Sequence, residues 1–132
     1  MTMTRIYLAV GIGGMLGASV RFLISELLGD IGESVFPWAT FFVNVTGAFL
    51  LTFLLFLPVV KARLGEAVFV GLTTGMLGAY TTFSLIIIEI HDLLLHDKLL
   101  ALVYLVATIF IGFFSSYLGY LIANRITSKE AT

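Results

Sequence analysis

Three stretches of this chain contain no charged side chain: residues 35–60, 67–88 and 99–124, with lengths of 26, 22 and 26 residues. Each exceeds the length of about 20 apolar residues that an α-helix needs to cross the hydrocarbon core of a bilayer. A fourth stretch, residues 6–28, carries only two charges, both toward its far end. Backbone polar groups in lipid must be bonded within their own segment, so these stretches predict four transmembrane helices.

The composition of the chain also favours a membrane protein. The chain is 60% hydrophobic and 11% charged, with a mean hydropathy of +1.12, which is far from the values of a soluble domain. The connections between the apolar stretches are too short to hold a soluble domain. We therefore expect residues 1–132 to form a single all-α transmembrane domain, with spans at about residues 6–28, 36–60, 66–91 and 99–124.

Several function classes are excluded by what the sequence lacks. The chain has no cysteine, which excludes disulfides, thiolate metal sites and cysteine nucleophiles. Its net charge of −1 argues against nucleic-acid binding. The residues His91, Asp92, His96 and Asp97 are spaced too loosely, in a short loop, to predict a metal site. No pair of carboxylates, Ser/His/Asp set or phosphate-binding loop suggests an enzyme.

The third span contains a segment that disfavours a continuous helix. Residues 71–84, GLTTGMLGAYTTFS, hold three glycines and four threonines, and glycine and β-branched residues at that density weaken a helix. Backbone released from helical bonding is tolerated at membrane depth only where it packs in protein, lines a wet path or binds an ion. We therefore expect the third helix to be broken midway across the membrane, at a place that handles ions.

Two side chains within the spans suit an anion path. Asn44 lies near the middle of the second span, in the sequence FFVNVTGAFL. Its amide either makes a hydrogen bond between helices or donates an N–H to a permeating anion. Phe83, beside the expected break, either packs or offers the positive edge of its ring to a poorly hydrated anion. The residues alone leave both alternatives open.

The fourth span carries a row of hydroxyl groups. Tyr104 and Thr108 are four residues apart, and the same step leads to Gly112 and then to Ser116, with Ser115 beside it. Residues at this spacing share one helix face, so the row is a polar stripe interrupted by one glycine. Hydroxyls can donate to an anion and rotate to follow it. Ordinary hydrogen bonding between helices explains the stripe equally well.

Arg21 and Glu89 are the charges closest to the span interiors. We expect Arg21 either to extend to the membrane interface or to concentrate anions at an entrance. We expect Glu89, six residues after Phe83, at a vestibule.

The basic residues set the expected orientation. With a cytoplasmic N-terminus, five basic residues lie on that side and two on the other, which favours both termini inside. The five are Arg5, Lys61, Arg63, Arg125 and Lys129, and the two are Arg21 and Lys98. A single four-helix subunit has little room for a polar path shielded from lipid, so we expect an oligomer. Gly13 and Gly17 form a small-residue pair that suits close helix contact, either between subunits or within one.

Three motifs, taken together in order, resemble the Fluc (CrcB) family of bacterial fluoride channels, and the likeness covers essentially the whole chain. GGMLGASVRF at residues 13–22 is similar to the family's first-helix motif, and PWATFFVNVTGAFL at residues 37–50 to its second-helix motif with the pore asparagine. GAYTTFS at residues 78–84 is similar to its third-helix break.

The resemblance implies an antiparallel, dual-topology homodimer in the bacterial cytoplasmic (inner) membrane, surrounded by lipid. It carries two fluoride pores and a central structural sodium ion. The backbone carbonyls of Gly78 and Thr81 would hold the sodium. The fluoride path would be lined by Asn44, Phe83, Ser84, Ile86, Tyr104, Thr108, Ser115 and Ser116, with Arg21 and Glu89 at the vestibule. The implied function is passive, fluoride-specific export of cytoplasmic fluoride, which lowers its toxicity.

Three features depart from the family's pattern. Ile86 stands where a second pore phenylalanine is frequent, Gly112 interrupts the hydroxyl stripe, and the five-to-two charge bias disfavours inverted insertion. The alternative function is a small proton-coupled exporter of the dual-topology four-helix type, which would need a carboxylate within the membrane. A structural subunit of a larger membrane complex is a third possibility, and it predicts no ion flux from the purified protein.

Overall fold

The computed structural model describes residues 3–29 and 36–130, and its regular structure there is entirely helical. Four long apolar helical segments are present: Met3–Leu28, Trp38–Leu55, Glu66–His96 and Lys98–Ser128. Each is long and apolar enough to cross a membrane. The prediction of an all-α membrane protein with four spans is therefore confirmed.

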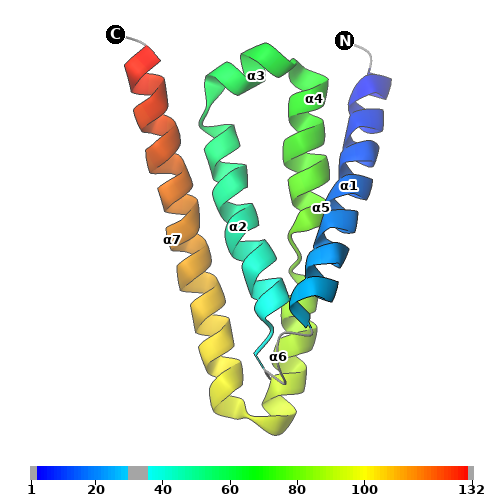
Figure 1. Cartoon of the computed structure of the whole chain (residues 1–132), viewed down its shortest axis with the longest axis vertical. Coiled ribbons are helices and arrows are strands. Elements are labelled where there is room, and N and C mark those ends of the chain that lie inside the picture. The colour runs from blue at the N-terminus through cyan, green and yellow to red at the C-terminus, as the bar shows by residue number, and fades with distance from the viewer. Residues whose placement is uncertain (1–2, 30–35, 131–132) are drawn as a thin grey trace.

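The spans differ in how they are built (Figure 1). The first is α1 (Met3–Gly29), the second is α2 (Trp38–Leu55), and the fourth is α7 (Lys98–Glu130). The third consists of α4 (Glu66–Val70), the π-helix η1 (Gly71–Leu77), α5 (Gly78–Tyr80) and α6 (Ser84–His96). A short helix, α3 (Pro58–Leu64), connects the second span to the third.

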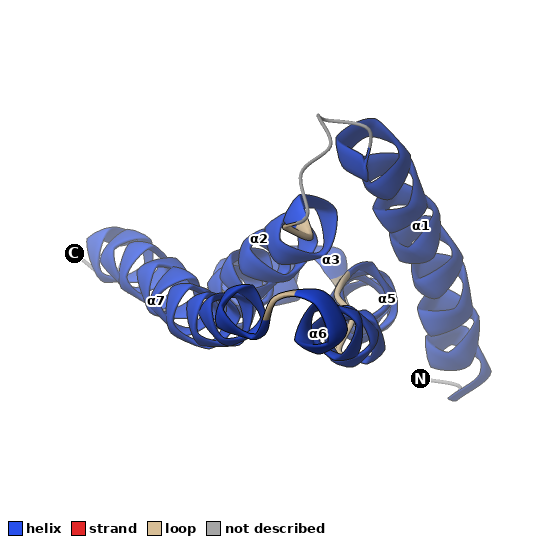
Figure 2. Cartoon of the chain, turned by 90° about the horizontal axis from the view of Figure 1, so that it is seen from below, coloured by secondary structure: helices blue, strands red, loops and turns tan. Residues whose placement is uncertain are grey.

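The helices are arranged with α1 and α7 at opposite edges and with α2 and the third span between them, as Figures 1 and 2 show. The two ends of the chain lie at the same end of the bundle, together with α3 (Figure 1). Because α3 contains Lys61 and Arg63, these two basic residues are at the end that carries the termini. The side chain of Lys129 lies outside the described part of the chain.

A proline and a glycine shape the turn between the second and third spans. α2 ends at Leu55, before the expected boundary at residue 60. Pro58 opens α3, and a proline disfavours helical backbone at the residue before it, here Leu57 with φ −110° and ψ 84°. Gly65 then turns the chain into α4 with φ 75°, a conformation that glycine adopts without steric cost.

Glycines bring the backbones of α1 and η1 into direct contact. A methyl group at Gly13 would collide with the carbonyl oxygen of Gly71, and one at Gly17 would collide with that of Met76. The Gly13/Gly17 pair is therefore used for packing within one subunit, the second of the two roles considered from the sequence.

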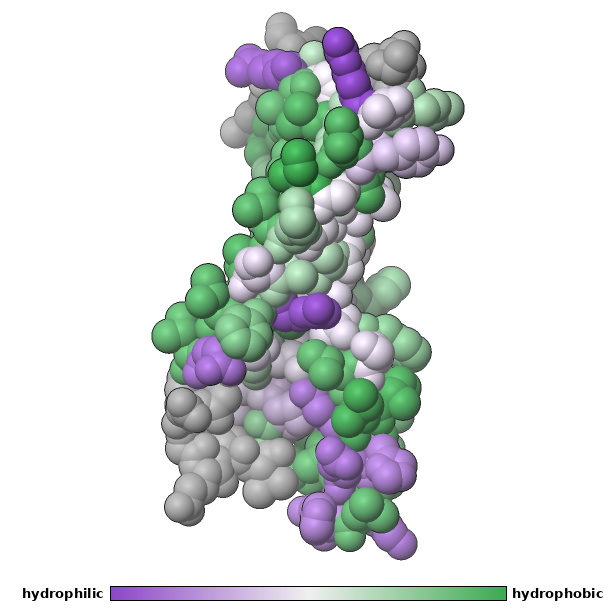
Figure 3. Space-filling view, turned by 90° about the vertical axis from the view of Figure 1, so that its right-hand side faces the viewer, coloured by the Kyte–Doolittle hydropathy of each residue, from purple (hydrophilic) through white to green (hydrophobic). Residues whose placement is uncertain are grey.

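Buried apolar side chains form two small clusters along the third span. One contains Val43, Leu77 and Tyr80, and the other contains Ile86, Leu93, Ala101 and Tyr104. Many other large apolar side chains are exposed, and Figure 3 shows hydrophobic residues over much of one face with hydrophilic residues gathered mainly at its two ends. This distribution is the one expected of helices that face lipid rather than water.

Candidate functional site

The third span is interrupted between Tyr80 and Ser84. Thr81 is extended, with φ −80° and ψ 160°, and α6 begins three residues later. The N–H of Thr81 still donates to the Leu77 carbonyl at 3.0 Å, so the helical bonding stops after this residue. The seven residues before α5 form a π-helix, whose wider turns occur mostly as short pieces at functional sites. The sequence analysis expected helix weakening over this segment but not a π-helix.

Asn44 of α2 hydrogen-bonds to the backbone of the third span at the interruption. Its Oδ1 accepts a hydrogen bond from the Thr82 N–H at 2.9 Å, and its Nδ2 donates to the Thr40 carbonyl at 3.0 Å. A primary amide has two N–H donors, and the Thr40 bond uses one of them. Asn44 is therefore part of the internal framework, and it also lines the pocket described next.

An open pocket of about 620 Å³ lies beside the interruption. Six of the predicted site residues line it: Asn44, Gly78, Thr81, Phe83, Ile86 and Thr108. Thr82 and Phe113, which the sequence analysis did not assign to the site, line it too. Ser84, Tyr104, Ser115 and Ser116 are not among its lining residues. The structure thus brings residues from α2, the third span and α7 together around one cavity.

Phe83 and Ile86 occupy different environments although both line the pocket. The Phe83 side chain is 75% exposed, and it projects from the subunit next to the interruption. Ile86 is 8% exposed and packs with Leu93, Ala101 and Tyr104. A ring at position 83 is therefore available to a ligand or a partner, whereas the side chain at position 86 is part of the core.

The serines of the α7 hydroxyl stripe make hydrogen bonds to α2, whereas the Thr108 hydroxyl is not bonded to another described residue. Ser115 donates to the Val45 carbonyl at 2.8 Å, and Ser116 shares a hydrogen bond of 2.6 Å with Thr52. These two serines fasten α7 to α2. Thr108 Oγ1 is buried and, among the described residues, has no hydrogen-bond partner within 3.5 Å. Thr108 is thus a member of the stripe that lines the pocket and whose hydroxyl is not used in a bond to another described residue.

Glu89 is partly buried and accepts hydrogen bonds from two neighbouring helices. Thr40 donates to its Oε1 at 2.5 Å, and the fully buried Tyr104 donates to its Oε2 at 2.6 Å. The carboxylate therefore ties α2, α6 and α7 together. The sequence analysis missed Thr40, although Thr40 lies one helical turn before Asn44 and its hydroxyl shares the Asn44 side of α2.

Arg21 reaches the interruption from α1. Its Nη1 donates to the Thr81 carbonyl at 3.4 Å, which is longer than the usual range of about 2.7–3.2 Å. A positive charge is thus near a carbonyl that has left the helical ladder. Neither expectation for Arg21, extension to the interface or attraction of anions at an entrance, included this contact.

Residues 8–120 of the chain match the family described as "CrcB-like protein, Camphor Resistance (CrcB)". The chain belongs to this family. A relative from Clostridium acetobutylicum, named "Fluoride-specific ion channel FluC 2", is 40% identical over 119 residues, covering 89% of this chain and 97% of the relative. A second relative named "Fluoride-specific ion channel FluC 2", from Carboxydothermus hydrogenoformans, is 42% identical over 118 residues, which cover 89% of this chain and 86% of the relative. A third relative, named "Fluoride-specific ion channel FluC 1", from Moorella thermoacetica, is 35% identical over 127 residues, which cover 96% of this chain and 91% of the relative.

The two carbonyls that the resemblance to the CrcB family assigns to sodium have lost part of their helical bonding. The Thr82 N–H, which would donate to the Gly78 carbonyl in a continuous α-helix, donates to Asn44 instead. The Thr81 carbonyl accepts the long bond from Arg21, and no other donor to it is found among residues 3–29 and 36–130. Neutral carbonyl oxygens suit a hard monovalent cation, and both residues line the open pocket.

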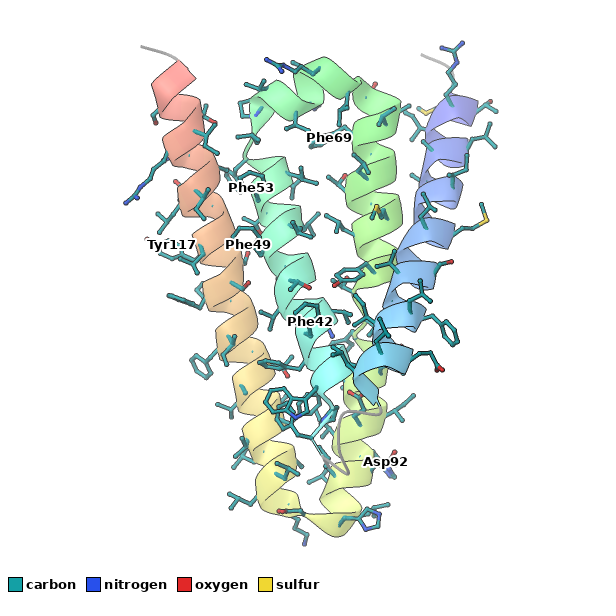
Figure 4. The ribbon with its side chains drawn as sticks, viewed as in Figure 1. Phe42, Phe49, Phe53, Phe69, Asp92 and Tyr117 are labelled. Carbon is teal, nitrogen blue, oxygen red and sulfur yellow. The ribbon has the colours of Figure 1, made fainter. Side chains whose placement is uncertain are left out.

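The His and Asp residues at the far end of α6 have ordinary surface roles in this CrcB-family chain. His91 Nδ1 and Asp92 Oδ1 are 3.7 Å apart, and both side chains are mostly exposed. Figure 4 shows Asp92 on the outside of α6. Asp97 Oδ1 accepts the N–H groups of Leu99 and Leu100, both at 3.0 Å, and so caps the first turn of α7.

Proposed function

We propose that this chain is a fluoride-selective channel that lets fluoride leave the cytoplasm passively and thereby lowers its toxicity. The observation that carries the proposal is the pocket beside the helix interruption, where Asn44, Phe83 and Thr108 meet. The similarity to relatives named fluoride-specific ion channels over about nine tenths of the chain supports the same function. The site is in the bacterial cytoplasmic membrane on this proposal.

The pocket can bind an anion without holding it too tightly. Fluoride loses strong hydration on entering a narrow path, so donors must replace its water molecules. The second N–H of Asn44 and the hydroxyl of Thr108 supply neutral donors, and the edge of the Phe83 ring adds a weak positive potential. None of these groups carries a full positive charge, and such a charge would bind fluoride too tightly for it to pass on.

We propose that the working unit is an antiparallel dimer with the interruption near the membrane midplane. The pocket is open on one side, and Phe83 projects from the subunit, so a second copy would close the path. A cation shared by two identical interruptions requires a twofold axis, and an axis in the membrane plane inverts one subunit. A cysteine at Lys129, the chain's only cysteine in that variant, should be labelled from both sides of an intact membrane. Labelling from one side alone contradicts dual topology.

The same dimer would hold a structural sodium ion. Gly78 and Thr81 would each contribute a backbone carbonyl, and two subunits would contribute four oxygens. When bound, the ion would compensate the carbonyl dipoles released at the two interruptions. Replacement of sodium by a large organic cation during purification should then weaken the dimer, which sedimentation or light scattering measures.

Glu89 favours a second candidate, the proton-coupled exporter. Such a transporter needs a carboxylate within the helix bundle, and Glu89 is enclosed between Thr40 and Tyr104. The two candidates differ in their response to a proton gradient. Passive fluoride flux does not require one, whereas coupled export does.

The deciding experiment is fluoride efflux from liposomes that contain only this protein, with chloride efflux as the comparison. We expect rapid fluoride efflux, little chloride efflux, and no requirement for a pH gradient. Asn44→Asp should abolish the flux, because an anionic group that only accepts hydrogen bonds replaces the donor. Asn124→Asp, at an exposed position near the end of α7, is the matched control and should conduct normally.

Each other result contradicts the proposal. Efflux that requires a pH gradient and disappears in Glu89→Gln identifies the exporter. An absence of any efflux from folded protein favours the structural subunit.

A further inference from the structure

The hydrogen bond between Asn44 and Thr82 lies where the helical ladder of the third span ends. In a continuous α-helix each N–H donates to the carbonyl four residues earlier. The Thr81 N–H follows this rule and reaches the Leu77 carbonyl at 3.0 Å. The next N–H, that of Thr82, instead reaches Oδ1 of Asn44 at 2.9 Å. The Gly78 carbonyl therefore loses the donor that a helix would give it.

Asn44 is held in the orientation that this bond requires. Its Nδ2 donates to the Thr40 carbonyl at 3.0 Å, one turn earlier on α2. The Thr82 N–H can only donate and the Thr40 carbonyl can only accept, so the amide oxygen must face Thr82 and the amide nitrogen must face Thr40. Thr40 is itself 4% exposed and bonded through its hydroxyl to Glu89. The orientation of the Asn44 amide is thus fixed by its hydrogen bond to the buried residue Thr40.

We infer that Asn44 is a positioning residue that keeps the Gly78 carbonyl open by drawing the Thr82 N–H away from it. This role is separate from any contact between Asn44 and fluoride. It rests on the proposed function in one respect, since the open carbonyl is one of those proposed to hold sodium. The space around Gly78 agrees with the role, because a methyl group built there meets no atom within 4 Å.

The chain offers a substitution that removes the N–H without forcing the helix to close. Proline has no N–H and favours extended backbone at the residue before it. Thr81 already has that conformation, with φ −80° and ψ 160°. Thr82→Pro should therefore keep the interruption and leave the Gly78 carbonyl open whether Asn44 is present or not. Thr82→Ala is its control, because it removes the hydroxyl that accepts from the Leu85 N–H at 3.3 Å and keeps the Thr82 N–H.

The Gly78 carbonyl can be observed directly by solid-state NMR of the protein in lipid bilayers. Labelling with carbonyl-¹³C glycine and ¹⁵N alanine selects Gly–Ala pairs, of which the sequence has three, beginning at Gly17, Gly47 and Gly78. The Gly17 pair serves as the internal reference, because Gly47 lies against Thr81 and Tyr80 beside the interruption. A carbonyl that gains a hydrogen bond shifts to higher frequency, and the spectra are compared in a sodium-free buffer so that no bound ion contributes.

The expected pattern has three parts. In Asn44→Ala the Gly78 signal moves to higher frequency, because the Thr82 N–H returns to it. In the double variant Asn44→Ala/Thr82→Pro the signal returns to the wild-type position. In Asn44→Asp it stays at the wild-type position, because a carboxylate oxygen still accepts from Thr82. Asn124→Ala is the matched control for the loss of an amide and should leave the signal unchanged.

An unchanged Gly78 signal in Asn44→Ala overturns the inference, and so does a double variant that keeps the shifted signal. If Asn44→Ala fails to fold, the double variant decides: folding restored by Thr82→Pro supports the role, and failure of the double variant while Thr82→Pro alone folds refutes it. Fluoride efflux separates this inference from the proposed function. A wild-type protein without efflux but with the expected carbonyl pattern contradicts the channel and leaves the positioning role intact.

Discussion

The two halves of the third span are held in place by different forces. The half before the interruption, α4 and η1, lies against α1 through glycines, and Phe69 of α4 points into the space between α4 and α2 (Figure 4). The half after it, α6, packs through Ile86 and Leu93 on α7 and is also held by the Thr40–Glu89–Tyr104 hydrogen bonds. The first half depends on close backbone packing against α1, whereas the second combines apolar packing with polar contacts. Substitutions in the first should therefore change stability, while those near the second should also change conduction.

The difference also explains where an ion path can form. Close backbone contact along η1 leaves no room for a hydrated ion, and the groove between α1 and η1 is lined almost wholly by apolar side chains. Past the interruption, polar groups and the open pocket replace this contact. The change from one kind of packing to the other occurs at Gly78, where packing does not require a glycine because a methyl group built there would meet no neighbouring atom within 4 Å.

The largest expected effect is at the contact between α1 and η1. Gly17→Ala places a methyl group against the Met76 carbonyl, and because both partners are backbone, the helices must separate. Overpacking of this kind costs typically about 1–3 kcal/mol. Unfolding of the purified protein in a denaturing detergent should show this loss of stability.

The matched control for this substitution is Gly11→Ala on the same helix. A methyl group there meets nothing within 4 Å, so it should be neutral or stabilise α1 by up to about 1 kcal/mol. Equal stabilities of the two variants would show that the glycine contact does not hold this half.

The next effect is at the polar contacts of α6. Tyr104→Phe removes the hydroxyl that donates to Glu89 and leaves a carboxylate oxygen without its partner in a partly buried site, where water replaces part of the lost bond. An unsatisfied group of this kind costs about 1–3 kcal/mol, and more when it is charged. Both stability and fluoride efflux should fall, because Glu89 lies on α6 about one turn after Ile86, which lines the pocket.

Tyr117→Phe provides the comparison, since Tyr117 is 51% exposed on the outer part of α7 (Figure 4). It should change neither property. A Tyr104→Phe protein as stable as Tyr117→Phe would mean that α6 is held by apolar packing, as the first half is.

A smaller effect is expected at Phe83, and it should appear in conduction alone. The ring is 75% exposed, so Phe83→Ile removes little packing within the subunit. The ring edge is worth about 0.5–1.5 kcal/mol in aromatic pairs, which corresponds to about a 2- to 12-fold loss of fluoride efflux. Phe110→Ile, at an exposed position of α7 that does not line the pocket, is the control. Normal, fluoride-selective efflux in Phe83→Ile would leave Phe83 as a packing residue between subunits.

The sequence predicted the four spans and the region of the site because both depend on local composition. Charge-free length identifies a membrane helix regardless of its neighbours, and the glycines and threonines of residues 71–84 mark weak helix. The grouping of Asn44, Phe83 and Thr108 around one pocket agrees with the residues named from the resemblance to the family. That these groups contact fluoride stays a prediction.

The partners of individual polar groups could not be predicted from the sequence. Helix rotation decides whether Ser115 faces the Val45 carbonyl or a pore, and spacing on α7 alone does not fix that rotation. The acceptor of Arg21 could not be predicted either, because its long, flexible side chain can reach several carbonyls. Ile86 was assigned to the pore by its place in the motif, whereas the structure also buries it in the core. Contacts between helices depend on how the helices pack on one another, and the local sequence of one helix does not determine that packing.

The smallest expected effect tests whether the serines of α7 belong with the structural contacts. Thr52 and Ser116 share a hydrogen bond of 2.6 Å between α2 and α7, on the side of α2 where Phe49 and Phe53 also face α7 (Figure 4). In a double-mutant cycle, Thr52→Val and Ser116→Ala should show a coupling energy of about 0.6 kcal/mol, the average for such bonds in membrane proteins. The single variants should conduct fluoride at the wild-type rate, because neither residue lines the pocket. A coupling near zero together with reduced efflux in Ser116→Ala would return Ser116 to the fluoride path and would extend that path along α7 beyond Thr108.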